Sequence, residues 1–250
     1  ELMYGVATDI TAEYKLTEER KALIAELLRS NQELKQFSYI TSHNMRSPIT
    51  NMLSIFQLLD IEKVSEPDTR ELLTALKSTS NHLNDTLNDL IKILIIKEEK
   101  DLDVKPLSLQ AVCQNVMKTI NNMVAHAKIT TNFIEAPLVY FNEGYLESIF
   151  LNLITNSVKY AHPDRIPEIK IESKEQEGKI ILTFCDNGIG MNMDRVKSKI
   201  FGLHQRFHTK ANSTGIGLYI VKSQVETLGG TIDFWSEEDK GTCFTLTFKN

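Results

Sequence analysis

Two interleaved series of residues, each spaced seven apart, constrain the first part of the chain more than any other feature. One series consists of Leu73, Ser80, Leu87 and Leu94, and the other of Leu76, Leu83 and Leu90. Together they form the a and d positions of a heptad repeat, which is typical of a helix packed in a coiled coil or a helical bundle. Because the surrounding sequence also contains almost no glycine, we predict that this part of the chain is helical.

Two helices joined by a short link are expected here. The segment Ser65-Glu66-Pro67-Asp68 fits the start of the second helix, with Ser65 as the N-cap and Pro67 in the first turn. Apolar residues at helical spacing predict an earlier helix over residues 17–60. The link of residues 61–65 is so short that the two helices must form an antiparallel hairpin. One hairpin has too small a core to be stable alone, so we expect a homodimer in which two hairpins form a four-helix bundle.

The character of the sequence changes near Lys105-Pro106, and we place a domain boundary between Glu98 and Leu107. Helical spacing covers residues 109–127, 142–161 and 215–228, and strand-like patterns cover residues 167–173, 179–185, 230–235 and 242–248. Weak periodicity over residues 191–214 predicts a mobile loop or lid. The expected fold class is α+β: a long N-terminal helical hairpin that forms a dimeric four-helix bundle, followed by a domain of mixed helices and strands.

Composition indicates a soluble globular protein. Hydrophobic residues make up 42% of the 250 residues and charged residues 24%, and the formal net charge is −5. This acidic balance argues against a nucleic-acid partner, and no apolar run is long enough for a membrane segment. Three widely spaced cysteines, Cys113, Cys185 and Cys243, indicate buried thiols in a reducing compartment. Because the sequence begins with Glu1 rather than Met, we expect it to be a piece of a longer protein.

Two glycine-containing segments in the second part suit nucleotide chemistry. Asp186-Asn187-Gly188-Ile189-Gly190 follows a predicted strand. Its carboxylate can accept a hydrogen bond from an exocyclic amine, and its glycines let the backbone approach a flat ligand. Ser213-Thr214-Gly215-Ile216-Gly217-Leu218 opens a predicted helix, where free N–H groups and the positive end of the helix dipole suit a triphosphate. Taken alone, each segment is explained equally well as a plain turn or helix start.

A third segment, Asn152-Leu153-Ile154-Thr155-Asn156-Ser157-Val158-Lys159-Tyr160, lies on a predicted helix. Asn152, Asn156, Lys159 and Tyr160 share about one face of that helix. Amide oxygens can bind Mg²⁺, an ammonium group can neutralise phosphate, and a tyrosine ring can pack on a base. A solvated polar stripe would explain any one of these residues, but the three segments together predict a nucleotide site.

The predicted first helix carries His43 one turn before Pro48. A proline inside a helix removes a backbone hydrogen bond and is expected to bend the helix. A lone histidine is usually incidental, but His43 lies beside the polar side chains of Asn44, Arg46 and Ser47. Neutral imidazole can attack the γ-phosphate of ATP. We therefore predict that His43 is an exposed nucleophile.

Together these segments resemble the sensor histidine kinases of two-component signalling, over nearly the whole chain. Residues 42–48 resemble the phosphoacceptor box of that family, residues 152–160 its N box, residues 186–190 and 213–218 its two glycine boxes, and residues 201–207 the F box of its ATP lid. The resemblance implies a dimerisation and phosphotransfer bundle followed by a Bergerat-type ATP-binding α/β sandwich. It also implies ATP and Mg²⁺ as cofactors.

By position, the resemblance implies that His43 is phosphorylated, that Asn156 is a Mg²⁺ ligand and that Asp186 accepts the adenine amino group. It implies that further residues line or shape the nucleotide site and its lid: Asn152, Lys159, Tyr160, Gly188, Gly190, Arg206, Thr214, Gly215, Gly217, Leu218 and Thr242. The phosphoryl group would then pass to an aspartate in the receiver domain of a response regulator.

Asn44 departs from the family pattern, in which Glu or Asp directly follows the phosphoacceptor histidine. An amide can orient the imidazole by hydrogen bonding but is a poor base, so we expect slow autophosphorylation. Ser47 stands where relatives that dephosphorylate their partner often have Thr or Asn, which leaves phosphatase activity open. These two residues complete the expected catalytic set with His43 and Arg46.

The first residues, Tyr4 to Thr11, resemble the closing strand of a PAS sensor domain and its exit into a signalling helix. The expected domains are the end of a PAS domain and a linker over residues 1–16, a dimerisation and histidine phosphotransfer domain over residues 17–102, and a catalytic ATP-binding domain over residues 103–250. We also expect an upstream sensor domain in the same chain. A cytoplasmic location is expected for this part, whether or not the parent protein is anchored in a membrane.

Three other interpretations compete with a histidine kinase. A dimeric signalling scaffold with weak or no kinase activity is favoured by Asn44, and it predicts nucleotide binding with little phosphohistidine. An ATPase of the gyrase or mismatch-repair kind would share the nucleotide fold but not the helical hairpin that bears His43. A helical adaptor would leave the glycine boxes unexplained.

Overall fold

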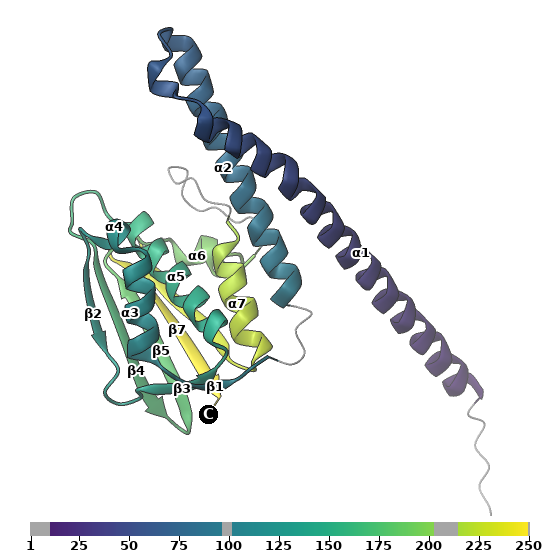
Figure 1. Ribbon diagram of the computed structural model, residues 1–250. Helices are drawn as coiled ribbons and strands as arrows, with labels where there is room; N and C mark the ends of the chain where they lie inside the picture. Colours follow the sequence, from purple (N-terminus) through teal and green to yellow (C-terminus); the bar gives the residue numbers. More distant parts are fainter. Residues whose placement is uncertain (1–10, 97–101, 203–214, 250) are drawn as a thin grey trace, which may run out of the picture.

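The computed structural model describes residues 11–96, 102–202 and 215–249 (Figure 1). Residues 1–10, 97–101, 203–214 and 250 lie outside the described part, as do the side chains of several helical residues, among them Ser42 and His43. The predicted PAS end and most of the predicted F box therefore fall outside it. Within the described ranges, no helix is both long enough and apolar enough to cross a membrane.

A long helical hairpin forms the N-terminal part of the structure. Helices α1 (Thr11–Leu58) and α2 (Pro67–Ile96) are joined by the short 3-10 helix η1 (Ile61–Lys63). The two helices pack against each other as the short link requires. Pro48 lies inside α1, and the helix continues on both sides of it.

The two heptad series of α2 have different surroundings. Ser80 and Leu87 of the first series are buried against α1, where Leu87 shares a small apolar core with Ile49 and Ile91. The hydroxyl of Ser80 also lies 2.9 Å from the sulfur of Met52 on α1. The second series, Leu76, Leu83 and Leu90, remains 53%, 42% and 37% exposed. One apolar stripe of α2 is therefore left open to solvent.

Two sheets build the C-terminal part. The larger has the strand order β2-β4-β5-β7-β6, and the smaller pairs β1 with β3. The strands are β1 (Lys105–Ser108), β2 (Lys128–Asn132), β3 (Leu138–Phe141), β4 (Glu168–Gln176), β5 (Lys179–Asp186), β6 (Thr231–Glu237) and β7 (Gly241–Lys249). Neighbouring strands are antiparallel except β2 and β4, which are parallel.

In the described part of the chain, the helices that cover the five-stranded sheet lie on one of its faces (Figure 1). They are α3 (Leu109–Thr119), α5 (Glu143–Lys159) and α7 (Gly217–Thr227), and the short helices α4 (Asn121–Val124) and α6 (Met193–Val196) lie in loops. Because side chains alternate along a strand, Leu182 and Phe184 of β5 are buried under the helices, while Thr183 and Cys185 face the other side. The core therefore lies in a single layer between the sheet and its helices.

Most predicted elements are present, with three differences. The expected helix over residues 109–127 is split into α3 and α4 at Ile120, whose φ of −106° and ψ of 20° are not helical. Strands β1, β2 and β3 were not predicted because they are only four or five residues long. The segment expected to be a loop from residue 191 contains one helical turn, α6.

The prediction of three buried thiols is wrong for two of the cysteines. Cys185 on β5 and Cys243 on β7 form a disulfide, although 58 residues separate them in the chain. The strand register places them directly opposite each other, and a cysteine count cannot reveal such pairing. Cys113 is a free thiol with no exposed surface, and burial raises its pKa to about 11.

Candidate nucleotide site

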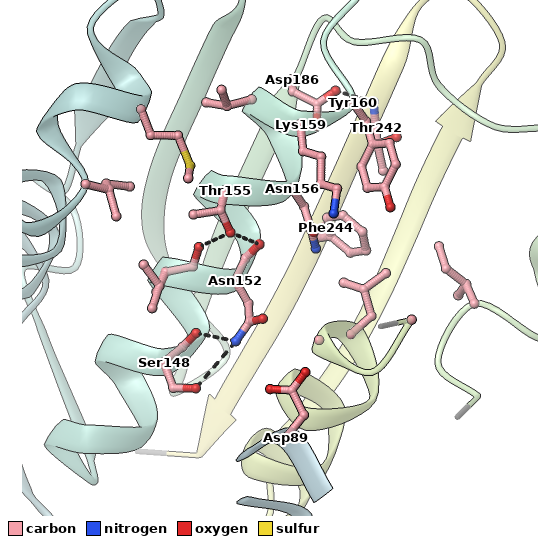
Figure 2. A pocket seen from close by; sticks show the side chains of 18 of the residues that line it. Asp89, Ser148, Asn152, Thr155, Asn156, Lys159, Tyr160, Asp186, Thr242 and Phe244 are labelled. Carbon is pink, nitrogen blue, oxygen red and sulfur yellow. Dashed lines mark hydrogen bonds between the residues drawn. The ribbon is translucent and has the colours of Figure 1, made fainter. Parts of the chain in front are cut away.

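A cavity of about 850 Å³ opens between α5, the start of α7, the ends of β5 and β7, and α2 (Figure 2). A volume of this size suits a small-molecule ligand. Ten of the predicted nucleotide-site residues line it: Asn152, Asn156, Lys159, Tyr160, Asp186, Gly190, Gly215, Gly217, Leu218 and Thr242. Gly188 lies next to it, since its N–H donates to Asp186 Oδ1 at 3.0 Å. Arg206 and Thr214 fall outside the described residues.

Helix α5 supplies one wall of the cavity. The helix begins at its N-cap Asn142, whose side-chain oxygen accepts a hydrogen bond of 3.0 Å from the N–H of Tyr145. One side of the helix is packed against the sheet through Leu146, Ile149 and Phe150, which have no exposed surface. Because that side is fixed by the core, the polar side of α5 is held facing the cavity.

The polar side of α5 is partly pre-ordered by its own backbone. Asn152 Nδ2 donates to the carbonyl of Ser148 at 2.8 Å, and Thr155 Oγ1 donates to the carbonyl of Leu151 at 2.7 Å. Figure 2 shows the side chains of Asn156 and Lys159 extending into the cavity beyond them. A neutral amide and an ammonium group therefore stand side by side on the wall, a pairing that suits a metal-bound polyphosphate.

The Asp186 carboxylate lies at the end of β5 and is held by three donors. The N–H groups of Gly188 and Thr242 donate to Oδ1 at 3.0 and 3.2 Å, and the hydroxyl of Ser157 donates to Oδ2 at 3.0 Å. Burial raises the pKa of Asp186 above its ordinary value, while the three hydrogen bonds act in the opposite direction. The carboxylate is thus a fixed acceptor in a largely desolvated position, as recognition of an amino group requires.

Close backbone approach at the bottom of the site depends on two glycines. Gly190 has a φ of +61°, and a Cβ there would lie 1.8 Å from the carbonyl oxygen of Glu237. Gly241 has a φ of +113°, and a Cβ would lie 1.9 Å from the carbonyl oxygen of Asp186. No other residue type fits either position, because both the conformation and the space exclude a side chain.

Thr242 is fixed by a second small network. The Thr242 hydroxyl lies 2.9 Å from the Ser236 hydroxyl. The Ser236 hydroxyl in turn accepts a hydrogen bond from the N–H of Met191 at 2.8 Å and donates one to the carbonyl of Gly241 at 3.0 Å. The network ties the loop after β5 to the β6–β7 hairpin, so the two strand ends that carry Asp186 and Thr242 are held together.

The sequence of this chain is similar to those of known ATPases and kinases. Residues 142–250 match the family of histidine kinase-, DNA gyrase B- and HSP90-like ATPases. The phytochrome-like protein Cph1 of Synechocystis is 29% identical over 92% of this chain, and the sensor histidine kinase YcbM of Bacillus subtilis is 24% identical over 94% of it. Residues 142–250 are therefore similar to the ATP-binding domains of this ATPase family.

Solved structures share the fold of the hairpin and the ATP-binding domain together. Full-length ShkA in complex with AMPPNP has a TM-score of 0.68 at 22% identity, covering 85% of this chain and 45% of that one. The histidine kinase AdeS of Acinetobacter baumannii has a TM-score of 0.58 at 24% identity, covering 83% of this chain and 97% of that one. The match spans 31% of the length of Cph1 and 77% of the length of YcbM.

Helix α2 contributes a side of the cavity that the sequence analysis missed. His82, Asp85, Asp89 and Lys92 line the cavity of the ATP-binding domain together with α5 and α7. Figure 2 shows Asp89 beside α7. The signal for these residues was their spacing of three, four and three, which places polar side chains on one helical face. Ser157 was also missed, although it lies within the predicted N box.

The predicted phosphoacceptor residues lie apart from the nucleotide cavity. His43 is on α1, and the side chains of Asn44, Arg46 and Ser47 around it are exposed. None of these three side chains lines the cavity of the ATP-binding domain. The structure therefore brings together the predicted nucleotide residues that it describes, but not the nucleotide and phosphoacceptor sites.

Proposed function

We propose that this chain is the kinase core of a sensor histidine kinase, in which Mg²⁺·ATP phosphorylates His43 and the phosphoryl group then passes to an aspartate of a response regulator. The observation that carries the proposal is the Asp186 carboxylate, held by three donors at the end of a cavity lined by the N-box residues. Such a fixed acceptor suits the amino group of adenine.

Asn156 is the expected Mg²⁺ ligand. Its amide oxygen is a hard, neutral donor, and Mg²⁺ in phosphate-transfer sites usually keeps several waters and takes few protein ligands besides the substrate phosphates. The described part of the chain holds no cluster of three or more His, Cys, Asp or Glu side chains suited to a metal. Asn156 together with Lys159 would therefore orient and neutralise the phosphates, which is where most of the rate in such transfers arises.

The packing of the hairpin supports the role of His43. Ile49 shares a small core with Leu87 and Ile91, and His43 lies six residues earlier, about 9 Å along the axis of α1. Because α2 runs antiparallel, this level corresponds to its last turns, where Lys92 lines the nucleotide cavity. The phosphoacceptor and the nucleotide thus lie at similar heights along the hairpin.

The open stripe of Leu76, Leu83 and Leu90 supports a homodimer. These side chains form the second heptad series of α2, whereas Ser80 and Leu87 of the first series are already buried against α1. A second hairpin packed on the stripe would bury them in a four-helix bundle. The resulting dimer would present two copies of His43 to the receiver domains of response regulators.

Labelling with γ-³²P ATP tests the proposal. The native chain, His43→Gln and Asp186→Asn are incubated with labelled ATP and Mg²⁺, and nucleotide affinity is measured in parallel by calorimetry. We expect acid-labile, base-stable label on the native chain alone, normal nucleotide affinity in His43→Gln, and weakened affinity in Asp186→Asn.

Other outcomes would contradict parts of the proposal. Nucleotide binding without label on the native chain would favour the dimeric scaffold with weak or no kinase activity, for which Asn44 argues. Equal label on the native chain and His43→Gln would mean that another residue is the acceptor. Unchanged affinity in Asp186→Asn would remove the carboxylate from nucleotide recognition.

A further inference from the structure

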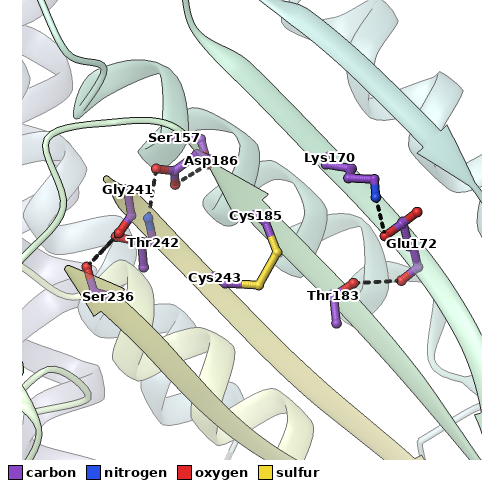
Figure 3. The surroundings of a disulfide bond; sticks show 10 residues. All are labelled: Ser157, Lys170, Glu172, Thr183, Cys185, Asp186, Ser236, Gly241, Thr242 and Cys243. Atoms are coloured by element: carbon purple, nitrogen blue, oxygen red, sulfur yellow. Dashed lines mark hydrogen bonds and ion pairs between the residues drawn. A yellow bond between two sulfur atoms is a disulfide. The ribbon is translucent and has the colours of Figure 1, made fainter. Parts of the chain in front are cut away.

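The helix-free face of the five-stranded sheet carries a row of four side chains across four strands. Lys170 on β4 is the register partner of Cys185 on β5, Cys185 of Cys243 on β7, and Cys243 of Trp235 on β6. Neighbours in such a row stand on the same face with their Cβ atoms about 5 Å apart. The Cys185–Cys243 disulfide therefore lies at the open surface of the domain rather than in its core (Figure 3).

The disulfide joins the two strands directly behind the nucleotide site. Cys185 precedes Asp186 in the chain, and Cys243 follows Thr242. Because side chains alternate, the cysteines face outwards while their neighbours face the cavity, where the N–H of Thr242 donates to Asp186 Oδ1 at 3.2 Å. Figure 3 shows this hydrogen bond and the disulfide on adjacent residues of the same two strands.

The bridge also lies at the end of the β5–β7 ladder. Cys185 and Cys243 are the last register pair of these strands on the side of the nucleotide site. Ladder ends open more readily than ladder centres, because fewer hydrogen bonds hold them. A covalent link at this position therefore limits the separation of the two strand ends that carry Asp186 and Thr242.

Both sulfur-bearing side chains are open to solutes. Cys185 and Cys243 are half-buried, and a separate cavity of about 250 Å³ beside Cys185 is lined by Lys128 and Lys170. Both lysines form ion pairs of 2.9 Å, with Glu168 and Glu172 respectively. Because the two lysine charges are balanced by these two carboxylates, the thiolate of a small reductant meets no excess of negative charge from these four residues.

We propose that Cys185–Cys243 is a thiol–disulfide exchange site, and that its reduction by a dithiol weakens nucleotide binding. A thiolate of the reductant attacks one sulfur and forms a mixed disulfide, and the other cysteine leaves as a thiolate that takes a proton from solvent. The second thiol of the reductant then closes its own disulfide and releases the first cysteine. Two electrons and two protons pass to the protein, which gains two thiols.

The exchange step stands on the disulfide alone, whereas the effect on affinity rests on the proposed nucleotide function. Reduction frees the ends of β5 and β7, so the hydrogen bond from Thr242 to Asp186 is held less firmly. If nucleotide binding loses the net free energy that one hydrogen bond contributes, the Kd of the nucleotide increases about two- to tenfold.

Two measurements on the native chain test the exchange step. Alkylation under denaturing conditions should add one group before treatment with dithiothreitol, at Cys113, and three groups after it. Trp235 is the only tryptophan in the chain, and its neighbour Cys243 belongs to a disulfide, a group that quenches indole fluorescence on contact. We expect Trp235 fluorescence to rise on reduction and to fall again on reoxidation. Three alkylated cysteines before reduction would overturn the proposal.

Calorimetry with Mg²⁺·ADP tests the effect on the nucleotide site. We expect a higher Kd for the reduced chain than for the oxidised chain, while the double variant Cys185→Ser/Cys243→Ser binds like the reduced chain with or without dithiothreitol. Equal affinity of the oxidised and reduced native chains would refute the coupling. Absence of ADP binding in both redox states would refute the proposed nucleotide function instead, and the alkylation result would be unaffected.

Discussion

Replacement of Ser157 by alanine should weaken nucleotide binding without removing any atom that lines the cavity. The Ser157 hydroxyl donates to Asp186 Oδ2 at 3.0 Å, whereas the other two donors, the N–H groups of Gly188 and Thr242, both contact Oδ1. Ser157→Ala therefore leaves one carboxylate oxygen without a donor from the described residues. Ser157 is a positioning residue in this argument, because it acts on the ligand only through Asp186.

The size of the effect follows from the kind of bond that is lost. A hydrogen bond to a charged group contributes about 1.5–3 kcal/mol to stability, so we expect the free energy of unfolding to fall by that amount at neutral pH. A less firmly held acceptor should lose about 0.5–1.5 kcal/mol of nucleotide affinity, which is an increase of about two- to tenfold in Kd.

The pH dependence of Ser157→Ala separates this mechanism from general loosening of the fold. Burial already raises the pKa of Asp186 above its ordinary value of 3.8, and the hydrogen bond from Ser157 lowers it. Removing that bond raises the pKa of Asp186 further. Because the folded-state pKa lies above the unfolded one, the stability linked to this group is complete below 3.8 and is lost as the pH rises through the folded value. The destabilisation of the variant should therefore shrink on acidification.

Nucleotide binding provides the matching readout. Protonated Asp186 cannot accept from an amino group with the strength of a carboxylate, so affinity falls as the pH drops through its pKa, and this fall should begin at higher pH in Ser157→Ala. Calorimetry with Mg²⁺·ADP over a pH series measures the shift. The Ser157 hydroxyl also lies 3.1 Å from the carbonyl oxygen of Leu153, one turn earlier in α5. Thr119→Ala is the control for that contact, since the Thr119 hydroxyl donates to the carbonyl of Asn115 at 3.1 Å but lies on α3. A native pH profile and native Kd in a folded Ser157→Ala chain would refute the reasoning.

Three further predictions concern the metal, the backbone at the bottom of the site and the phosphoacceptor. Asn156→Ala should abolish Mg²⁺-dependent labelling with γ-³²P ATP while its thermal unfolding stays close to native; normal labelling would exclude Asn156 as the metal ligand. Gly241→Ala should lower the melting temperature and cost at least about 1–3 kcal/mol, because of its positive φ and a contact of 1.9 Å with the carbonyl oxygen of Asp186. Gly178→Ala is its control, with a φ of +69° and nothing within 4 Å, and equal losses in the two variants would mean that the contact is unimportant. Asn44→Asp should keep or raise the autophosphorylation rate, since a carboxylate is the better base; a sharp loss in a rapid-quench assay would show that the amide does something an acid cannot.

The heptad repeat and the helix start signals predicted the parts of the fold that depend on local sequence. The heptad series specified α2, and the start signal at Ser65-Glu66-Pro67-Asp68 placed its first residue at Pro67. Likewise Asn142, at the start of a predicted helix, is the N-cap of α5. These features succeed because a helix is stabilised by contacts within three or four residues, so its limits are written in adjacent positions.

Features that depend on strand pairing could not be predicted in the same way. Strand β2, with the sequence Lys128–Asn132, has one apolar residue and owes its conformation to its parallel neighbour β4. The Cys185–Cys243 bridge likewise depends on the register of β5 against β7. Ser157 was visible within its motif, but its contact with Asp186 joins residues 29 apart in the chain. Each of these facts is set by the tertiary fold rather than by the local pattern.

Helix α2 shows why the nucleotide site was only partly predictable, because three sides of this helix have three different surroundings. Ser80 faces α1, Leu83 belongs to the open apolar stripe, and Asp89 lines the nucleotide cavity. Ser80 and Asp89 are nine residues apart, which is two and a half helical turns, so they lie on opposite sides. Since a packed helix moves as a rigid element, any rotation of α2 that repacks the hairpin must also move Asp89 relative to the nucleotide. We therefore expect the packing of the bundle and the shape of the nucleotide site to change together.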